Sequence, residues 1–279
     1  MRSPDSLYHR NITQDESRSP SFINHCNLPP WIISSEEFQE NPQPIEIDGV
    51  KTTDRRIFDR LAEIDDPKER SRVFHDYIVV KFQLHEWAEN HPTAKRNRVH
   101  SYAQFLHGWG ADSNGHAGAV LKAWVESRFG LLATYHNGML AESAEAREQF
   151  SNDRMRGSAK TIGVLMQLDL LYTFCQEELQ RRFPTERWKK LYRGTHDPEE
   201  YAVHNSDASK RESVVQLNNL SSFTSDPEVA WEFGSLAWEV NVPLAKIVFF
   251  SGLLPQHLLG GESEYLVLGG NYRVRTLLF

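Results

Sequence analysis

The chain has 279 residues, of which 39% are hydrophobic and 25% are charged, and its formal net charge is −7. This composition is typical of a globular protein that forms its own hydrophobic core, and the length fits one large domain or one domain with an extension. The negative charge argues against a general nucleic-acid-binding protein, whose surface is usually basic.

The two cysteines, Cys26 and Cys175, lie far apart and have no metal-ligand spacing. A reducing cytoplasm is the simplest location for such thiols. The polar N-terminus has no apolar segment of the kind found in signal peptides. The most apolar run, residues 161–174, is interrupted by Gln167 and Asp169 and is too short to span a bilayer. We therefore expect a cytoplasmic protein with no metal site and no membrane insertion.

Residues 1–21 are rich in Ser, Pro, Asp and Arg and are expected to be disordered. Residues 24–33 contain paired prolines and should form an extended arm, on which Trp31 contacts either another surface or the body of the protein. Asp66 and Pro67 favour the start of a helix, because aspartate caps and proline suits the first turn. Apolar residues at four-three spacing predict one core-facing stripe that ends near residue 91, namely Val73, Tyr77, Val80, Leu84 and Trp87.

Further helices are expected downstream. Ser113 is a candidate cap for a helix that turns Trp124 and its apolar neighbours inward, and residues 142–154 read as a polar surface segment. Residues 161–179 are strongly apolar and should form the central helix of a helical lobe.

After Pro184 the segments shorten and β-branched and aromatic residues become frequent. Residues 196–211 are polar and are expected to form a loop, and Asp226 should cap a helix at 227–233. Strands are expected at 188–193, 220–224, 238–242, 246–250, 264–268 and 272–278, the last two as a hairpin about Gly269–Asn271, and a helical turn is expected at 254–259. The predicted class is α+β, a helical N-terminal part packed on a compact β-rich core.

The segment Gly261–Val267 contains the motif Glu262-Ser263-Glu264. In a strand, alternate side chains share a face, so Glu262 and Glu264 would project together. Like charges this close shift each other's pKa, which is frequent at functional sites. Taken alone, so short a motif is better explained as two solvated carboxylates on an exposed strand face.

Two upstream motifs change that interpretation. Arg193 closes an expected strand, and Ser222 belongs to a Ser/Thr-rich strand. A strand-ending arginine, a Ser/Thr-rich strand and a Glu-x-Glu motif, in that order, form the Arg–Ser–Glu (R-S-E) pattern. Over the last third of the chain, this pattern resembles the arginine-specific mono-ADP-ribosyltransferases.

The chemistry of such transfer gives each side chain a role. Cleavage of the bond between nicotinamide and ribose leaves positive charge on the sugar, which the carboxylate of Glu264 would stabilise. A hydroxyl of Ser222, or of a neighbour in the stretch Ser222–Ser225, would orient that carboxylate. Arg193 offers a planar fork of donors for the NAD pyrophosphate or ribose. Glu262 would position an acceptor arginine and take its proton, since a guanidinium is protonated at neutral pH.

Each residue also has a purely structural explanation. Arg193 could be an ordinary ion-pair partner, and the Ser/Thr-rich strand could simply cap the next helix. Phe223 and Phe249 are more typical of a core than of a nicotinamide-stacking surface. His196 and His204 match no catalytic triad or zinc spacing. The absence of a G-x-G-x-x-G motif and of a P-loop gives no support to a Rossmann NAD site.

Four segments together resemble the NAD(+)–dinitrogen-reductase ADP-ribosyltransferases of nitrogen-fixing bacteria. They are Asn24–Trp31, Glu36–Phe38, Leu191–Gly194 and Glu262–Glu264, and the likeness runs from about residue 22 to the C-terminus. The resemblance implies transfer of ADP-ribose from NAD+ to one arginine of dinitrogenase reductase, which inactivates nitrogenase. It also implies a PII-type nitrogen signal protein as a regulatory partner.

The resemblance further implies roles for single residues. Arg193 would bind NAD, Glu264 would be the catalytic glutamate, and Glu262 would face the acceptor. The catalytic set is Glu264, Glu262 and Ser222, and the set that binds NAD+ as a substrate is Arg193, Gly194, Ser222, Thr224, Ser225 and Glu264. We expect a disordered tail at 1–21 and a catalytic domain at 111–279, with a helical lobe (111–184) and a β core (185–279). The arm and helices at 22–110 are assigned to partner recognition, because the R-S-E set leaves them without a chemical role.

Two other functions remain open at this stage. One is an arginine-specific transferase or toxin-like enzyme with a different protein target. The other is a non-catalytic binding module that has kept the fold. The retention of Arg193, Glu262 and Glu264 argues against the second, and the lack of a secretion signal argues against a toxin.

Overall fold

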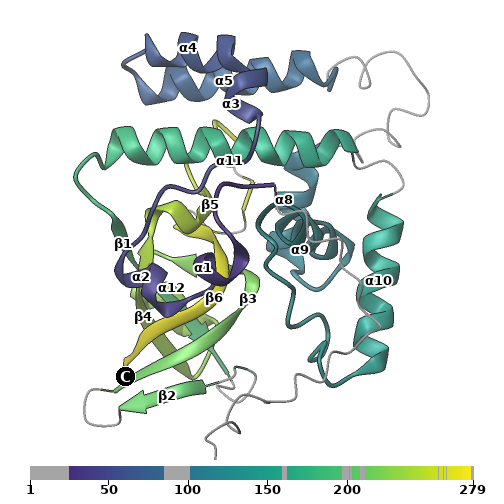
Figure 1. Ribbon diagram of the computed structural model, residues 1–279, viewed down its shortest axis with the longest axis vertical. Coiled ribbons are helices and arrows are strands. Elements are labelled where there is room, and N and C mark those ends of the chain that lie inside the picture. The colour runs from purple at the N-terminus through teal and green to yellow at the C-terminus, as the bar shows by residue number, and fades with distance from the viewer. Residues whose placement is uncertain are drawn as a thin grey trace, which may run out of the picture.

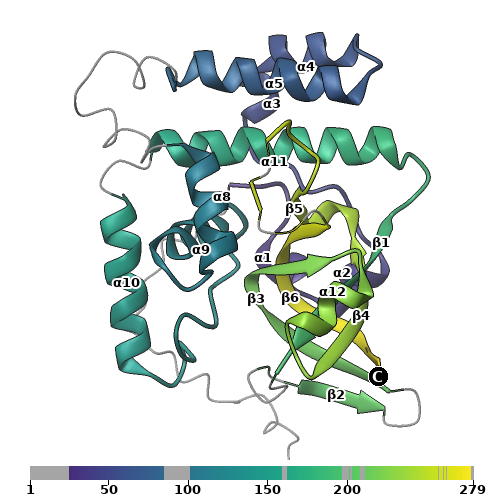
Figure 2. The same cartoon turned by 180° about the vertical axis from the view of Figure 1, so that it is seen from behind.

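The computed structural model describes residues 25–84, 101–158, 162–196, 201, 203–207, 211–256, 258–259, 261 and 263–277. The expected disordered tail lies outside these residues. Helices form one side of the molecule and an antiparallel sheet forms the other, as Figures 1 and 2 show from opposite directions. One continuous hydrophobic core runs from Ile33 to Val274 across both parts. The predicted α+β class is confirmed.

The helices of the described part begin and end close to capping signals in most cases. In chain order they are α1 (Pro30–Ile33), α2 (Glu36–Glu40), α3 (Val50–Thr53), α4 (Arg55–Ala62), α5 (Pro67–Lys81), α8 (Tyr102–Ala111), α9 (His116–Phe129), α10 (Ala144–Ser158), α11 (Ile162–Arg182) and α12 (Pro227–Glu232), with a 3-10 turn, η3 (Leu244–Lys246).

The long helix α11 is central, as its apolar sequence predicted. It lies between the α4–α5 layer on one side and the sheet with α8 and α9 on the other (Figure 1). A helix covered on opposite sides must be apolar around most of its circumference. Phe174 of α11 accordingly stacks on Phe74 of α5 with ring centroids 4.0 Å apart.

A buried ion pair also joins α5 to α11. Glu178 is fully buried and accepts hydrogen bonds from Arg70, one of them at 3.1 Å to Oε2. The other end of the same guanidinium donates to the carbonyls of Ile64 and Asp65 at 2.8 and 2.7 Å. Because both charges are hydrogen-bonded, their burial is tolerated. Arg182 also donates to Glu178 Oε2, at 3.2 Å, so loss of Glu178 is the change that would leave the buried Arg70 without a carboxylate partner.

Helix α5 begins as predicted but ends early. The Asp66 carboxylate accepts from the amides of Lys68 and Glu69 and caps the helix, which stops at Lys81 rather than near residue 91. The predicted core stripe holds at Val73 but is wrong at Val80, which is 66% exposed. Its last member, Trp87, lies outside the described residues.

Helix α9 carries the predicted inward face, with Trp124 and its apolar neighbours buried. Its cap is different from the prediction. The N-cap is Gly115, and no side chain caps it, so Ser113 does not have the expected role. The polar segment after residue 142 forms α10, which packs beside α9.

The sheet has six strands in the order β2-β3-β1-β4-β6-β5, and every pairing is antiparallel. β3 also pairs with β6, so the pairings of β3, β1, β4 and β6 run round a closed circuit. Closure removes free edges among these strands. The bounds are β1 (Trp188–Thr195), β2 (Val203–Asp207), β3 (Glu212–Thr224), β4 (Leu236–Pro243), β5 (Ile247–Phe250) and β6 (Glu264–Leu277).

The predicted hairpin about residues 269–271 is wrong, because β6 is one continuous strand. Its pairing with β3 is interrupted between Leu217 and Leu220 by a β-bulge. A Cβ on Gly269 would lie 1.9 Å from the carbonyl oxygen of Asn218, and Gly270 has φ +110°. The two glycines therefore serve the close approach of a bulge rather than a chain reversal.

Two other expectations are corrected. The segment predicted as loop at 196–211 contains the strand β2, whose polar residues pair with β3 through the backbone. The turn expected at 254–259 is not helical in its described residues. A polar sequence does not exclude a strand at the edge of a sheet, because the backbone hydrogen bonds between strands do not depend on side-chain type.

The N-terminal arm is not extended throughout as predicted, because Pro30–Ile33 form the short helix α1, and the arm packs on the sheet. The side chain of Gln39 donates to the carbonyls of Asn241 and Arg273, both at 3.1 Å, and accepts from the Arg273 amide at 2.7 Å. The carbonyl of Ser34 accepts from the Asn271 amide at 2.8 Å. Trp31 is 71% exposed, so it does not pack against the described body of the protein.

A buried lysine donates a hydrogen bond to the strand segment at the bulge, and its burial leads to a prediction about the pH dependence of stability. Lys246 is fully buried, donates to the Gly269 carbonyl at 3.0 Å and lies 4.4 Å from the ring centroid of Tyr272. Desolvation by burial lowers the pKa of Lys246 to about 7. Between that pKa and its normal value near 10.5, the unfolded chain binds more protons than the folded protein.

The stability of the wild-type protein relative to Lys246→Met should therefore rise as pH increases from 7 to 10. The slope should be at most about 1.4 kcal/mol per pH unit. Chemical denaturation of both proteins at several pH values measures this difference. A relative stability that stays constant or falls over this range would show that the pKa of Lys246 is not lowered in the folded protein.

Candidate active site

The three motifs of the R-S-E pattern lie on adjacent strands. β3 pairs with β1 on one side and with β6 on the other, and Thr224 is opposite both Tyr192 and Glu264. Arg193, near the end of β1, and Glu264, the first residue of β6, are thus brought to the same end of β3. Three segments that are distant in sequence meet at one place.

Ser222 and Glu264 are directly linked. Ser222 is opposite Leu266 in the β3–β6 register, and Glu264 lies two residues before Leu266 in β6, on the same face. At this diagonal position, the Ser222 hydroxyl donates to Glu264 Oε1 at 2.8 Å. Among the serines and threonine of residues 222–225, Ser222 is thus the one that the structure places against this carboxylate.

Arg193 lies beside this pair. Its Nη1 donates to the Ser222 carbonyl at 2.6 Å, and its Nη2 donates to the Tyr201 hydroxyl at 3.1 Å. The same ring of Tyr201 packs edge-on against Trp238, with centroids 5.0 Å apart. The guanidinium is therefore held in one orientation by backbone and side chain, which suits recognition of a planar or bidentate group.

The Nε atom of Arg193 is buried and has no hydrogen-bond partner among the described residues. A buried donor without a partner is costly, and proteins usually keep one only where a ligand or water completes it. This donor therefore needs a partner that the described residues do not supply.

Glu262 lies outside the described residues, so the geometry of the two glutamates is not described. The residues on either side of it, Gly261 and Ser263, are described. The Ser263 carbonyl accepts from the Ser225 amide at 3.0 Å, and the Gly261 carbonyl accepts from the Ser251 hydroxyl at 2.5 Å. The common face of Glu262 and Glu264 stays a prediction.

The other candidate residues have structural contacts of their own. Thr224 Oγ1 accepts from the Asp226 amide at 3.1 Å, just before Asp226 caps α12. Burial raises the pKa of Tyr265, and a side-chain hydrogen bond with Ser225 opposes that rise. A Cβ on Gly194 would lie 1.9 Å from the carbonyl oxygen of Ala230, so glycine lets α12 pack on β1. Their roles in NAD binding stay predictions.

Trp109 of α8 is a site residue that the sequence did not indicate. Its indole Nε1 donates to the Ser222 hydroxyl at 2.8 Å. Trp109 is 4% exposed and lies among apolar residues of a helix, a setting typical of core tryptophans. No motif spacing marks it, because its link to Ser222 arises only when the helical lobe packs on β3.

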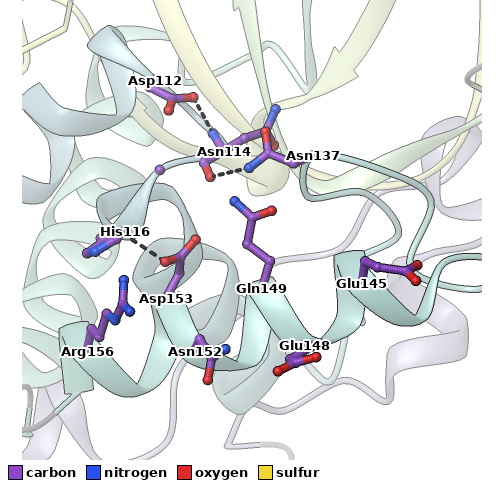
Figure 3. Close-up of a pocket in the computed structure, with 11 residues that line it drawn as sticks. Asp112, Asn114, His116, Asn137, Glu145, Glu148, Gln149, Asn152, Asp153 and Arg156 are labelled. Carbon is purple, nitrogen blue, oxygen red and sulfur yellow. Dashed lines mark hydrogen bonds and ion pairs between the residues drawn. The ribbon is translucent and has the colours of Figure 1, made fainter.

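The aromatic residues Phe223 and Phe249 are buried in the core, as expected. Two open cavities are among those that described residues line, and neither of these two includes Arg193, Ser222 or Glu264. One of about 550 Å³ lies between the start of α9 and helix α10 (Figure 3). The other, of about 450 Å³, lies beside the arm and α11. In the described part of the chain, no helix is long and apolar enough to cross a membrane.

Comparison with known proteins agrees with this geometry. The family model of dinitrogenase reductase ADP-ribosyltransferase (DRAT) matches residues 23–276. The NAD(+)–dinitrogen-reductase ADP-D-ribosyltransferase of Rhodospirillum rubrum is 39% identical over 273 residues, which cover 96% of this chain and 99% of the relative. No solved structure matches the chain significantly.

A serine that orients a glutamate beside a strand-borne arginine defines the class of R-S-E ADP-ribosyltransferases. Within that class, the match over most of the length shows that the chain belongs to the dinitrogenase reductase ADP-ribosyltransferase family.

The packing of α12 on β1 can be tested with two glycine substitutions. Gly194→Ala should destabilise the protein by about 2 kcal/mol or more, because the added methyl group would overlap backbone atoms of α12. Gly163→Ala is the matched control. Nothing lies within 4 Å of its added Cβ in helix α11, so it should stabilise by up to about 1 kcal/mol. Urea denaturation measures both, and equal midpoints would contradict the packing described for Gly194.

Proposed function

We propose that this protein transfers ADP-ribose from NAD+ to an arginine of dinitrogenase reductase, the iron protein of nitrogenase, and thereby inactivates nitrogenase. The observation that carries the proposal is the Ser222–Glu264 hydrogen bond beside Arg193, in a chain of the DRAT family. The name of the Rhodospirillum rubrum relative specifies the same donor and the same protein target.

Glu264 is the proposed catalytic residue. NAD+ supplies the ADP-ribosyl group and a nicotinamide that leaves with the electron pair of the broken glycosidic bond. The Glu264 carboxylate would stabilise the positive charge that develops on the ribose. The hydroxyl of Ser222 fixes one carboxylate oxygen, so little reorganisation is needed when the charge appears.

Arg193 is the proposed NAD-binding residue. One N–H of Nη1 and one of Nη2 hold the guanidinium against β3 and Tyr201, and the second N–H of each nitrogen is the proposed donor to a ligand oxygen. Gly194, Thr224 and Ser225 complete the proposed NAD site by their position next to Arg193 and Ser222.

Glu262 is the proposed acceptor-side residue. The target arginine is protonated at neutral pH and is a poor nucleophile until it loses a proton. In the transfer step, one guanidinium nitrogen bonds to the ribose carbon that nicotinamide leaves, and Glu262 receives the proton lost from that nitrogen. Water would replace arginine in simple NAD hydrolysis, which needs no such help.

A PII-type nitrogen signal protein is the proposed regulatory partner, and residues 22–110 are the proposed recognition segment. The arm offers Trp31 and Ile32, which are 71% and 38% exposed, as an apolar contact that the described body does not cover. We also propose a cytoplasmic location, which suits the buried thiols of Cys26 and Cys175.

Incubation with labelled NAD+ and purified dinitrogenase reductase tests the main proposal. Wild-type protein should label the reductase, and Glu264→Gln should reduce the rate by about 100-fold or more while the protein stays folded. Nicotinamide release without labelled reductase would point to another target. Binding of the reductase with neither event would point to a non-catalytic module.

Glu262→Gln separates the two glutamate roles. Transfer to the reductase should fall at least about tenfold more than NAD hydrolysis, because only transfer requires removal of a guanidinium proton. Nicotinamide release measured with and without the reductase gives both rates in one preparation. Equal loss of the two rates would refute the division of labour.

A further inference from the structure

The hydroxyl of Ser222 stands between two side chains. It accepts from Trp109 Nε1 at 2.8 Å and donates to Glu264 Oε1 at 2.8 Å. The directions are fixed by chemistry, since an indole N–H can only donate and an ionised carboxylate can only accept. The indole therefore occupies a lone pair of the serine oxygen and turns its single proton toward Glu264.

Helix α8 holds Trp109 firmly in this position. Its Gly108 packs on α9, where an added Cβ would lie 2.6 Å from Ala117 Cβ. At the start of the helix, the Tyr102 amide donates to Gln167 of α11 at 2.8 Å. The glycine allows α8 to lie close to α9, and the backbone hydrogen bond fixes the start of α8 against α11.

The bulge in β3 fixes the other side of the contact. Asn219 donates to the carbonyls of Lys122 and Leu131 at 2.9 and 3.0 Å, and both carbonyls belong to the helical lobe. Asn218 donates to the Tyr135 carbonyl at 2.9 Å and accepts from the Thr134 amide at 3.0 Å. These hydrogen bonds attach β3 to the helical lobe three residues before Ser222.

A buried lysine also lies over the ring of Trp109. Lys122 is 1% exposed, and its Nζ lies 6.0 Å from the centroid of the Trp109 ring. This Nζ donates to Asn114 Oδ1 and to the Tyr135 carbonyl, both at 2.9 Å. Asn114 is in turn bonded to Asp112 and Asn137 at the edge of the cavity in Figure 3. The indole thus has little freedom to leave Ser222.

We propose that Trp109 is a positioning residue for the ADP-ribosyl transfer, acting through Ser222 on Glu264. This inference rests on the proposed function of Glu264. With the indole N–H in place, the serine proton has one acceptor and the carboxylate one orientation. Without it, the hydroxyl can rotate toward other acceptors, and Glu264 loses its fixed direction toward the ribose.

Trp109→Phe removes the donor and keeps most of the ring. NAD hydrolysis without the reductase should show a kcat lower by about threefold to tenfold, the range expected for one hydrogen bond, with an unchanged KM for NAD+. In the Ser222→Ala background, the same substitution should cause no further loss, because the hydroxyl through which it acts is gone.

Trp124→Phe is the matched control. Trp124 is fully buried in α9 and donates from its indole Nε1 to Asp169 at 2.8 Å, away from the R-S-E residues. It should lower the unfolding midpoint as Trp109→Phe does, yet leave kcat unchanged. Additive losses in the Trp109 and Ser222 double variant, or an equal loss of kcat in Trp124→Phe, would mean that Trp109 only supports the fold.

A second readout does not depend on activity. The indole N–H proton resonance of Trp109, identified by its absence in Trp109→Phe, should move upfield in Ser222→Ala because its acceptor is lost. An unchanged resonance overturns the inference. If the wild-type protein neither hydrolyses NAD+ nor labels the reductase, the proposed function fails, and the resonance still decides whether Trp109 and Ser222 are coupled.

Discussion

The bulge at Asn218 and Asn219 is the constraint on which the site depends. By interrupting the β3–β6 ladder, it turns two amide side chains out of the sheet and into the helical lobe. Amides can donate and accept at once, so two residues satisfy several buried backbone groups at the junction. The bulge also needs glycine opposite it, and Gly269 meets that need. Ser222 follows three residues after Asn219 and contacts both Trp109 of the helical lobe and Glu264 of the β core.

The meeting of Arg193, Ser222 and Glu264 at one candidate site could be predicted from the sequence. The order of Arg193, Ser222 and Glu264 indicated adjacent strands, and the structure confirms that Ser222 contacts the other two. The prediction succeeded because strand alternation and the needs of the chemistry are local properties. It left the choice of serine open, since only the β3–β6 register decides which hydroxyl lies diagonal to the carboxylate.

The errors share a physical cause, which is that tertiary packing overrides local signals. Glycines at 269–270 look like a hairpin turn, but they serve a close approach to another strand. Val80 follows the apolar spacing of α5 and is still exposed, because α11 covers a different face. Trp109 has the sequence context of an ordinary core residue, and its proposed role depends on one indole N–H that bonds to a strand distant in sequence.

The main hydrophobic core has a consequence for dissecting the protein. Residues from the arm, α5, α8 and α9 share this core with the strands that carry Arg193, Ser222 and Glu264. A fragment that starts after α8 would expose the faces that Phe74 and Tyr102 now cover. The helical lobe and the strands should therefore melt in a single transition. The transferase is therefore expected to fold as one unit, and not as an enzyme joined to a recognition domain that folds separately.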